Sequence, residues 1–209
     1  MNILYQDPHL LLCEKPVGLL SEGEGPDSLP AQLAALTGGP VYPVHRLDRG
    51  VGGLMVYAKN RRTAAALSEA VRRREMEKQY LCVVSGAPEA PAGTLEDLLY
   101  WDAARGKSFP VTRERRGVKR ASLSYEVLEG REGLSLLRVT LHTGRTHQIR
   151  VQFASRRLPL LGDRKYGGAG PGPIALWSHR LAFRHPVSGE AMDLSLPPPP
   201  ADPWTLFQK

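Results

Sequence analysis

Asp48 is the residue whose surroundings in the sequence best suit chemistry. Its carboxylate lies between Arg46 and Arg49, three glycines follow it within five residues, and the apolar run 54–57 comes next. Such a run predicts a strand, and glycines allow the backbone before it to turn sharply and to approach a ligand closely. Loops carried by rigid strands often hold functional groups. Asp48 is therefore a candidate catalytic carboxylate, and the structural alternative is a turn in which it caps nearby backbone amides.

The sequence lacks the patterns of several other catalytic classes. Its six histidines form no HExxH pair, and Cys13 and Cys82, each inside an apolar run, lack metal-ligand spacing. No Gly-x-Ser-x-Gly elbow offers a serine nucleophile, and no Gly-x-Gly-x-x-Gly follows a strand. A glycosidase needs a second carboxylate, for which Glu14 and Asp163 are only remote candidates. This elimination favours carboxylate chemistry in a basic setting.

The charge of the chain indicates a polyanionic partner. Its 209 residues include 28 Lys and Arg against 21 Asp and Glu, a formal net charge of +7. The cations cluster at Arg72–Arg74 and within 113–120, where five of eight residues are basic. Such clusters suit nucleic acid, although a helix C-terminus also favours cations like Arg72–Arg74. No apolar run could span a bilayer and no export signal opens the chain, so we expect a cytoplasmic protein without membrane association.

The elements expected around Asp48 are mostly short strands and hairpins. Helices are predicted from Ser28 to about Leu36, from the N-cap Asn60 to about Glu75, and from Thr146 onward. Residues 87–121 are predicted to be a less regular loop region that bears a hairpin, with short strands near 108–111. The other predicted strands are residues 3–5, 10–13, 54–57, 78–86, 122–128, 134–141, 181–184 and 192–196. Because hairpins outnumber strand–helix–strand units, we predict an α+β fold with a mixed, mostly antiparallel sheet flanked by helices and loops.

Four motifs occur in an order that resembles one family of RNA-modifying enzymes. They are His45-Arg46-Leu47-Asp48 before Gly53-Leu54, Lys78-Gln79-Tyr80, Gly144-Arg145-Thr146-His147-Gln148-Ile149-Arg150-Val151, and Leu161-Gly162-Asp163 before Tyr166-Gly167. The opening Lys15-Pro16-x-Gly18 also fits. A lone His-Arg-Leu-Asp would be a weak signal, but four ordered motifs are a strong one. Nearly the whole chain thus resembles the RluA-type RNA pseudouridine synthases.

This resemblance implies one pseudouridine-synthase catalytic domain over residues 1–209, without a separate N-terminal RNA-binding domain, acting as a monomer. The implied reaction breaks the bond from ribose C1′ to N1 of a uridine in rRNA or tRNA and joins C1′ to C5 of the same base. It needs no metal and no organic cofactor. A uridine inside a duplex would have to be flipped out to reach the enzyme.

The same resemblance implies roles for individual residues. Asp48 would be the nucleophile, and Arg150 would pair with it, with Arg145 as the less favoured candidate for that role. Tyr80 would stack on the target base and lie close enough to act on ribose or base protons. Whether Asp48 attacks C1′ directly or acts through a glycal intermediate stays open. Arg46 would fill the place that the flipped base vacates. The residues expected to bind RNA are Arg46, His45, Arg145, His147, Arg116, Lys119, Arg120, Arg156 and Arg157.

Each of these residues also has a structural interpretation. Tyr80 could be a core aromatic, Arg150 a cation on a helix surface, and His45 and His147 structural hydrogen-bonding groups. A rival function is a non-catalytic RNA-binding or RNA-chaperone protein on the same scaffold. Loss of the aspartate would mark that rival, and Asp48 is present.

One stretch departs from the family pattern. Val51 and Gly52 stand where the family commonly has Thr and Ser, so two hydroxyl groups are missing beside Asp48. We expect either a more mobile loop or backbone amides in place of the hydroxyls.

Overall fold

A computed structural model of the protein describes residues 2–207. Contacts between residues divide the chain into two compact units. Of the described residues, the first unit consists of 2–78 and 177–198, and the second of 79–176 and 199–207. Each unit is described by itself.

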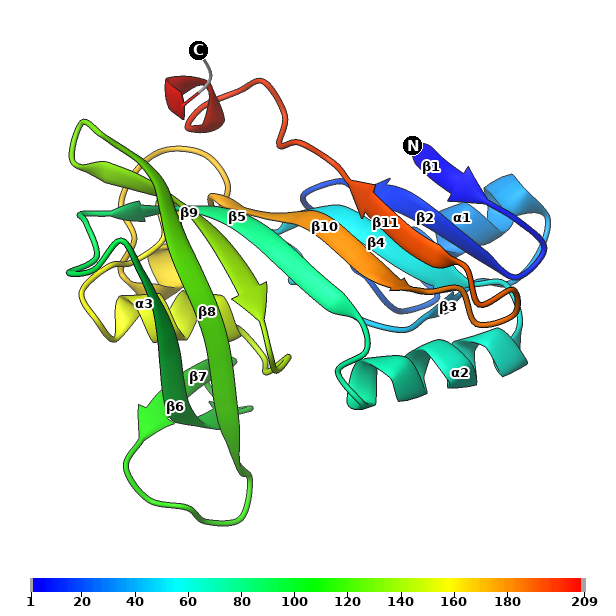
Figure 1. The fold of residues 1–209 in the computed structure, drawn as a ribbon, viewed down its shortest axis with the longest axis horizontal. Coiled ribbons are helices and arrows are strands. Elements are labelled where there is room, and N and C mark those ends of the chain that lie inside the picture. Colours follow the sequence, from blue (N-terminus) through cyan, green and yellow to red (C-terminus); the bar gives the residue numbers. More distant parts are fainter. Residues whose placement is uncertain (1, 208–209) are drawn as a thin grey trace. The chain divides into compact units, whose positions relative to one another are not determined.

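The first unit is built on a mixed sheet (Figure 1). Antiparallel pairing joins β1 to β2, β2 to β4, β3 to β4 and β10 to β11, whereas β10 runs parallel to β4. The prediction of a mixed, mostly antiparallel sheet is confirmed. The strands are β1 (Ile3–Gln6), β2 (Leu10–Lys15), β3 (Tyr42–Pro43), β4 (Gly52–Ala58), β10 (Leu176–Arg184) and β11 (Ala191–Ser195).

Two capped helices accompany this sheet. Helix α1 (Leu29–Thr37) begins after Ser28, whose side chain accepts from the amide of Ala31, and helix α2 (Arg61–Arg72) begins after Asn60. Both starts were predicted from the capping residues. Helix α2 ends three residues earlier than predicted, because Arg74 adopts a left-handed backbone conformation (φ 62°) that a helix cannot continue through.

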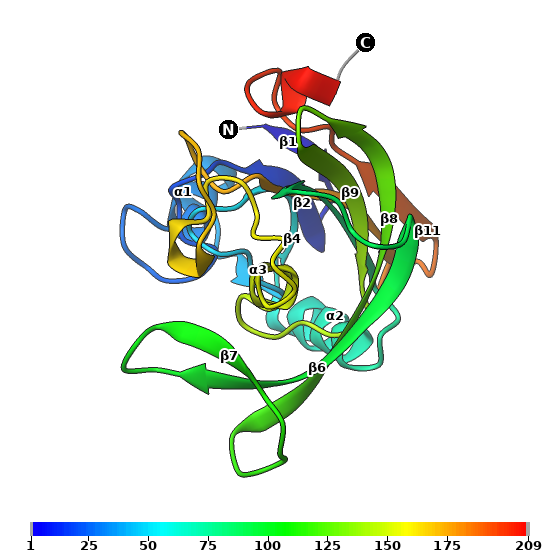
Figure 2. The same ribbon diagram turned by 90° about the vertical axis from the view of Figure 1, so that its left-hand side faces the viewer.

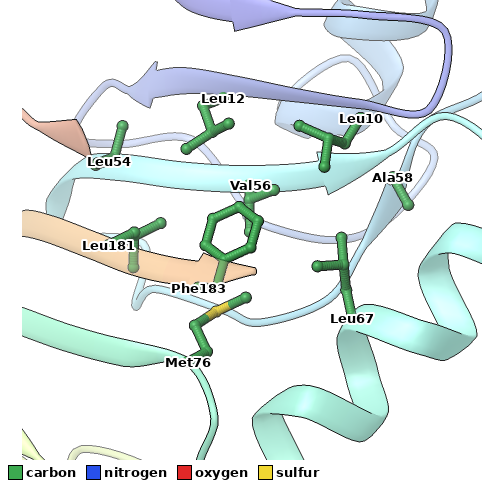
Figure 3. Packing of buried hydrophobic residues seen from close by; sticks show 9 residues of the cluster. All are labelled: Leu10, Leu12, Leu54, Val56, Ala58, Leu67, Met76, Leu181 and Phe183. Atoms are coloured by element: carbon green, nitrogen blue, oxygen red, sulfur yellow. The ribbon is translucent and has the colours of Figure 1, made fainter. Parts of the chain in front are cut away.

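One core cluster of the first unit lies on one face of its sheet, while Leu11, Cys13, Met55 and Tyr57 are buried on the opposite face. Side chains that alternate along β2 and β4 point to the same side, where Phe183 of the neighbouring strand β10 lies among them and Leu67 of α2 covers them (Figure 3). Burial of this apolar face, rather than helix propensity, therefore holds α2 in place. The cluster consists of Leu10, Leu12, Leu54, Val56, Ala58, Leu67, Met76, Leu181 and Phe183.

The second unit is an antiparallel sheet in the order β5, β9, β8, β6 and β7. The predicted hairpin of residues 122–141 is confirmed, although its first strand begins earlier, at Val118. Buried Val151 of α3 (Gln148–Ala154) packs against Leu99 and Ala121 of this sheet. The strands are β5 (Glu77–Ser85), β6 (Ala92–Asp102), β7 (Lys107–Val111), β8 (Val118–Arg131) and β9 (Leu134–Leu141).

The prediction for 87–121 is right about a hairpin and about a short strand near 108–111, which is β7, but it misses the long strand β6. Strand β6 is eleven residues long and forms a hairpin with β7 (Figure 2). Pro91 and Gly93 at its start are typical of turns, and the adjacent acids Glu96 and Asp97 interrupt the alternation of apolar and polar residues that would indicate a strand. Pairing with β8 along nearly its whole length supplies the stability that the local sequence does not indicate.

The start of the third helix also differs from its prediction. Helix α3 begins at Gln148 rather than at Thr146, because His147 is left-handed (φ 55°) and stands outside the helix as its N-cap. Two short 3-10 helices, η1 (Arg164–Tyr166) and η2 (Trp204–Phe207), complete the described chain. Among residues 2–207, the structure contains no helix long and apolar enough to cross a membrane.

Candidate active site

A buried lysine at the end of β2 forms hydrogen bonds with the backbone of the loop that carries Asp48. Lys15 is fully buried, and its Nζ donates to the carbonyl oxygens of Val51 (2.7 Å), Pro16 (3.0 Å) and Arg49 (3.4 Å). Burial lowers the pKa of Lys15 to about 8, while the negative charge of Asp48 acts in the opposite direction. The ammonium thus holds the backbone on the C-terminal side of Asp48 and lies within electrostatic reach of its carboxylate.

Backbone and hydroxyl contacts hold the loop on both sides of Asp48. The Oγ of Ser21 accepts from the amide of Leu47 (2.9 Å) and donates to its carbonyl oxygen (2.7 Å). Gly18 and Arg49 also exchange hydrogen bonds, with the amide of Gly18 donating to the Arg49 carbonyl and Arg49 Nε donating back, each at 2.8 Å. These contacts hold the loop backbone on both sides of Asp48 in a chain that has Val51 and Gly52 at the positions of the Thr and Ser hydroxyls.

His45 occupies a structural position at the edge of β4. Its Nε2 accepts from the backbone amide of Val56 (3.2 Å), which lies between the stretches of β4 that pair with β3 and β10. Burial, and then the positive charge of Lys78, lower the pKa of His45 to about 3. The imidazole is therefore neutral near pH 7 and satisfies a strand amide, which agrees with the structural interpretation of this histidine.

Gly53 allows β10 to lie beside the start of β4. Its backbone has φ 117°, and a Cβ there would stand 2.5 Å from the backbone nitrogen of Ser178 on the paired strand. Only glycine fits this position. The close approach places β4, and hence the end of the Asp48 loop, firmly in the sheet.

Arg150 and Asp163 form a buried, bidentate ion pair in the second unit. Nε of Arg150 donates to Oδ2 of Asp163 at 2.7 Å, and Nη2 of Arg150 donates to Oδ1 at 2.8 Å. Both side chains are almost fully buried, with 6% and 1% of their surface exposed. The helix-surface interpretation of Arg150 is therefore wrong. Bidentate geometry fixes the plane of the guanidinium as well as its charge.

Aromatic rings continue from this ion pair toward the surface. The Arg150 guanidinium lies over the ring of Tyr166, 5.1 Å from its centroid, and the Tyr166 hydroxyl contacts Nδ1 of His147 at 2.9 Å. The His147 ring in turn meets Trp101 edge-on, with centroids 5.4 Å apart. We call Arg150, Tyr166, His147 and Trp101 the aromatic ladder.

Tyr80 is placed by β5, opposite Val139 of β9, and is 5% exposed. Asp48 belongs to the first unit, whereas Tyr80 and Arg150 belong to the second. The pairing of Arg150 with Asp48 and the role of Tyr80 stay predictions.

The cations expected to bind RNA differ in their surroundings. Arg116, Lys119 and Arg157 are exposed. The other predicted arginines have protein partners: Arg46 pairs with Glu22, Arg120 with Glu114 and Arg156 with Asp97, and Arg145 donates to the carbonyl oxygen of Arg120.

Sequence reasoning gave no role to Lys15, Tyr166 or Trp101. For Lys15 a signal exists, because it continues the buried run of β2 in phase with Cys13. Tyr166 and Trp101 gain their significance only from contacts with residues distant in the sequence. Within the described part of the chain, no group of three His, Cys, Asp or Glu side chains could hold a metal ion.

Comparisons of the sequence with known proteins find RNA pseudouridine synthases. The RNA pseudouridylate synthase family matches residues 9–155. An uncharacterized RNA pseudouridine synthase of Mycobacterium bovis is 35% identical over 97% of this chain and 70% of its own length. The ribosomal large subunit pseudouridine synthase D of Xanthomonas campestris is 35% identical over 95% of this chain and 66% of its own length.

Solved structures show the same fold. The human RNA pseudouridylate synthase domain containing 4 superposes with a TM-score of 0.78 at 26% identity, covering 95% of this chain and 88% of its own. The human domain containing 1 protein reaches a TM-score of 0.80 at 22% identity, covering 95% and 83%. The fold class is thus that of the pseudouridine synthases, α+β with a mixed sheet. The chain belongs to the RluA-type RNA pseudouridine synthase family, a family of isomerases.

Proposed function

We propose that this protein converts a uridine within RNA to pseudouridine, with Asp48 as the nucleophile. The observation that carries the proposal is the clamped loop of Asp48. Lys15, Ser21 and Gly18 hold the backbone on both sides of the carboxylate, so little reorganisation is needed when a substrate binds. The Lys15 ammonium adds a fixed positive charge near that carboxylate.

The reaction uses the carboxylate to hold the ribose while the base turns. A carboxylate oxygen of Asp48 bonds to C1′ as the bond from C1′ to N1 breaks, and the electron pair leaves on the uracil. After rotation, C5 of the uracil bonds to C1′ and the carboxylate leaves. The proton on C5 is then lost and N1 gains one, so atoms and charge balance.

Arg150 and Tyr80 complete the proposed site. Arg150 would pair with Asp48 and keep it ionised and aimed, and the bidentate contact with Asp163 supports such a role because it fixes the guanidinium plane. Tyr80 would stack on the target base. The target would be a uridine in rRNA or tRNA, and the protein would act as a monomer in the cytoplasm.

Release of tritium tests the proposal directly. RNA transcripts that carry uridine labelled with tritium at C5 lose the label when pseudouridine forms. We expect wild-type protein to release tritium from rRNA or tRNA transcripts and Asp48→Asn to release none, while RNA affinity stays near the wild-type value. Asp27→Asn is a matched control, since Asp27 forms an exposed ion pair with Arg49 in the same unit.

The rival function predicts a different result. A non-catalytic RNA-binding protein would bind the transcripts without releasing tritium. Tritium release by Asp48→Asn at the wild-type rate would remove Asp48 as the nucleophile.

A further inference from the structure

Trp101 stands out among the three tryptophans of this chain. It lies near the end of β6 and is 39% exposed, whereas Trp177 and Trp204 are 4% and 7% exposed. Strand register places it opposite Ser108, on the β6–β7 hairpin. A large indole is thus left accessible on a hairpin that the rest of the second unit holds in place.

The indole is fixed from one side by the aromatic ladder. It meets His147 at an interplanar angle of 88°, and His147 is held by the Tyr166 hydroxyl. That hydroxyl also accepts from the amide of Ser108 (2.7 Å), and Ser108 Oγ donates to the carbonyl oxygen of Thr146 (2.6 Å). The hairpin and the ladder therefore brace each other. A side chain that is oriented before binding loses little conformational entropy when a ligand stacks on it.

The sequence around Trp101 is strongly basic. Residues 101–120 contain seven Lys and Arg against two acidic residues. Asp102 and Glu114 pair with Arg105 and Arg120, and Arg116 and Lys119 are exposed. An accessible aromatic ring among exposed cations is the combination that binds single-stranded nucleic acid: bases stack on the ring, and the cations contact phosphates.

We propose that Trp101 stacks on an unpaired base of the RNA substrate, next to cations of the β6–β7 hairpin and the following loop that hold the phosphates. This inference rests on the proposed function, because that function supplies the RNA as the ligand of Trp101. Stacking by Trp101 adds which feature of that RNA the enzyme would select. A duplex keeps its bases stacked on one another and offers no free face to the indole. Trp101 thus favours RNA in which a nucleotide is unpaired.

Binding of two probes at several salt concentrations tests the proposal. The probes are a single-stranded uridine 20-mer and a 20-base-pair RNA duplex, and the variants are Trp101→Ala, Trp101→Phe and Arg116→Ala. We expect Trp101→Ala to weaken 20-mer binding roughly 5- to 100-fold without changing the slope of log Kd against log salt. Trp101→Phe keeps a stacking face and should retain most of the affinity, and the duplex should bind Trp101→Ala and wild type alike.

Two controls separate stacking from charge and from general surface loss. Arg116→Ala should reduce the salt slope by about 0.7 for a single strand, because one phosphate contact is lost. Leu128→Ala removes another exposed apolar side chain of the same unit, 38% exposed on β8, and should leave both affinities unchanged. Unchanged 20-mer affinity in Trp101→Ala, or equal weakening for the duplex, would overturn the proposal.

Failure of this inference can be told apart from failure of the proposed function. If wild type releases tritium but Trp101→Ala binds the 20-mer as wild type does, stacking by Trp101 is wrong and pseudouridine formation stands. If wild type releases no tritium but the Trp101 variants bind as expected, the stacking site stands and the proposed activity falls.

Discussion

Gly52 lies against the indole of Trp177 so closely that a Cβ at position 52 would stand 2.5 Å from Cζ3 of the ring. The two residues are partners in the parallel pairing of β4 with β10. The glycine where the family commonly has Ser is thus matched by a ring that fills the space of the missing side chain. We therefore interpret the departure from the family pattern as a local exchange of volume.

This relationship predicts that Gly52→Ser destabilises the fold. Overpacking a tight core site costs about 1–3 kcal/mol, which lowers Tm by about 2–4 °C per kcal/mol in a protein of this size. Thermal or urea unfolding measures the effect. Gly39→Ala is the matched control, because nothing lies within 4 Å of a Cβ there, and it should be nearly neutral.

A double mutant shows whether Trp177 is the cause. Trp177→Leu opens the space beside position 52, so adding Gly52→Ser to it should cost less than Gly52→Ser costs alone. Strict additivity of the two changes would show that the ring is not what excludes the serine.

The buried ion pair predicts a large stability loss in Asp163→Asn. Removing the Asp163 charge takes away the bidentate counter-charge that it supplies to the buried Arg150 guanidinium, which costs about 3–5 kcal/mol. Urea unfolding measures this loss. Glu126→Gln breaks the exposed pair with Arg138, whose side chains are 56% and 42% exposed, and should cost no more than about 1 kcal/mol. Similar losses of unfolding free energy in Asp163→Asn and Glu126→Gln would contradict the prediction that the buried ion pair contributes more to stability than the exposed one.

Arg150 and Arg156 should differ in their effects on catalysis. We expect Arg150→Ala to reduce kcat for tritium release far more than Arg156→Ala, which should mainly raise KM. The reason is that Arg150 is the proposed partner of Asp48, whereas Arg156 lies near the surface and pairs with Asp97. Equal losses of kcat would remove Arg150 from the proposed site.

Lys15 makes stability depend on pH above neutrality. Its folded-state pKa is about 8, below the ordinary 10.5, so between these values the unfolded chain holds a proton that the folded protein has released. Stability from this residue is therefore full above about pH 10.5 and is lost as the pH falls through 8, by roughly 1.4 kcal/mol per pKa unit. Urea unfolding from pH 7.5 to 10.5 should show the rise in wild type. Lys15→Met should lack this component, and the same rise in both proteins would refute the assignment.

His45 has the corresponding effect at acidic pH. The folded pKa of about 3 lies below the ordinary 6.5, so the unfolded chain takes up a proton first as the pH falls. Stability from neutral His45 is present above pH 6.5 and declines toward pH 3. His45→Gln keeps an acceptor for the Val56 amide but cannot titrate, so its unfolding free energy should fall less steeply over that range. An unfolding free energy that falls as steeply in His45→Gln as in wild type between pH 6.5 and 3 would contradict this assignment.

Much of the fold is encoded in local patterns. Ser28 and Asn60 mark the starts of α1 and α2, because a cap depends only on the residues of the first turn. The hairpin of β8 and β9 follows from alternating side chains on either side of Glu129–Gly133. Asp48 stands out in the sequence because its neighbours are unusual in type and spacing. The features predicted correctly are therefore those that depend on residues close together in the chain.

The other features depend on contacts between residues that are far apart in the sequence. Strand β6 depends on pairing with β8, Lys15 is significant because it reaches carbonyl groups 34 and 36 residues away, and Gly52 is explained by Trp177. The partner of Arg150 in the second unit proved to be Asp163, thirteen residues further on. Hydrogen bonds, ion pairs and volumes shared between distant residues leave no periodic signal in the sequence, since each depends on where the folded backbone brings the two groups.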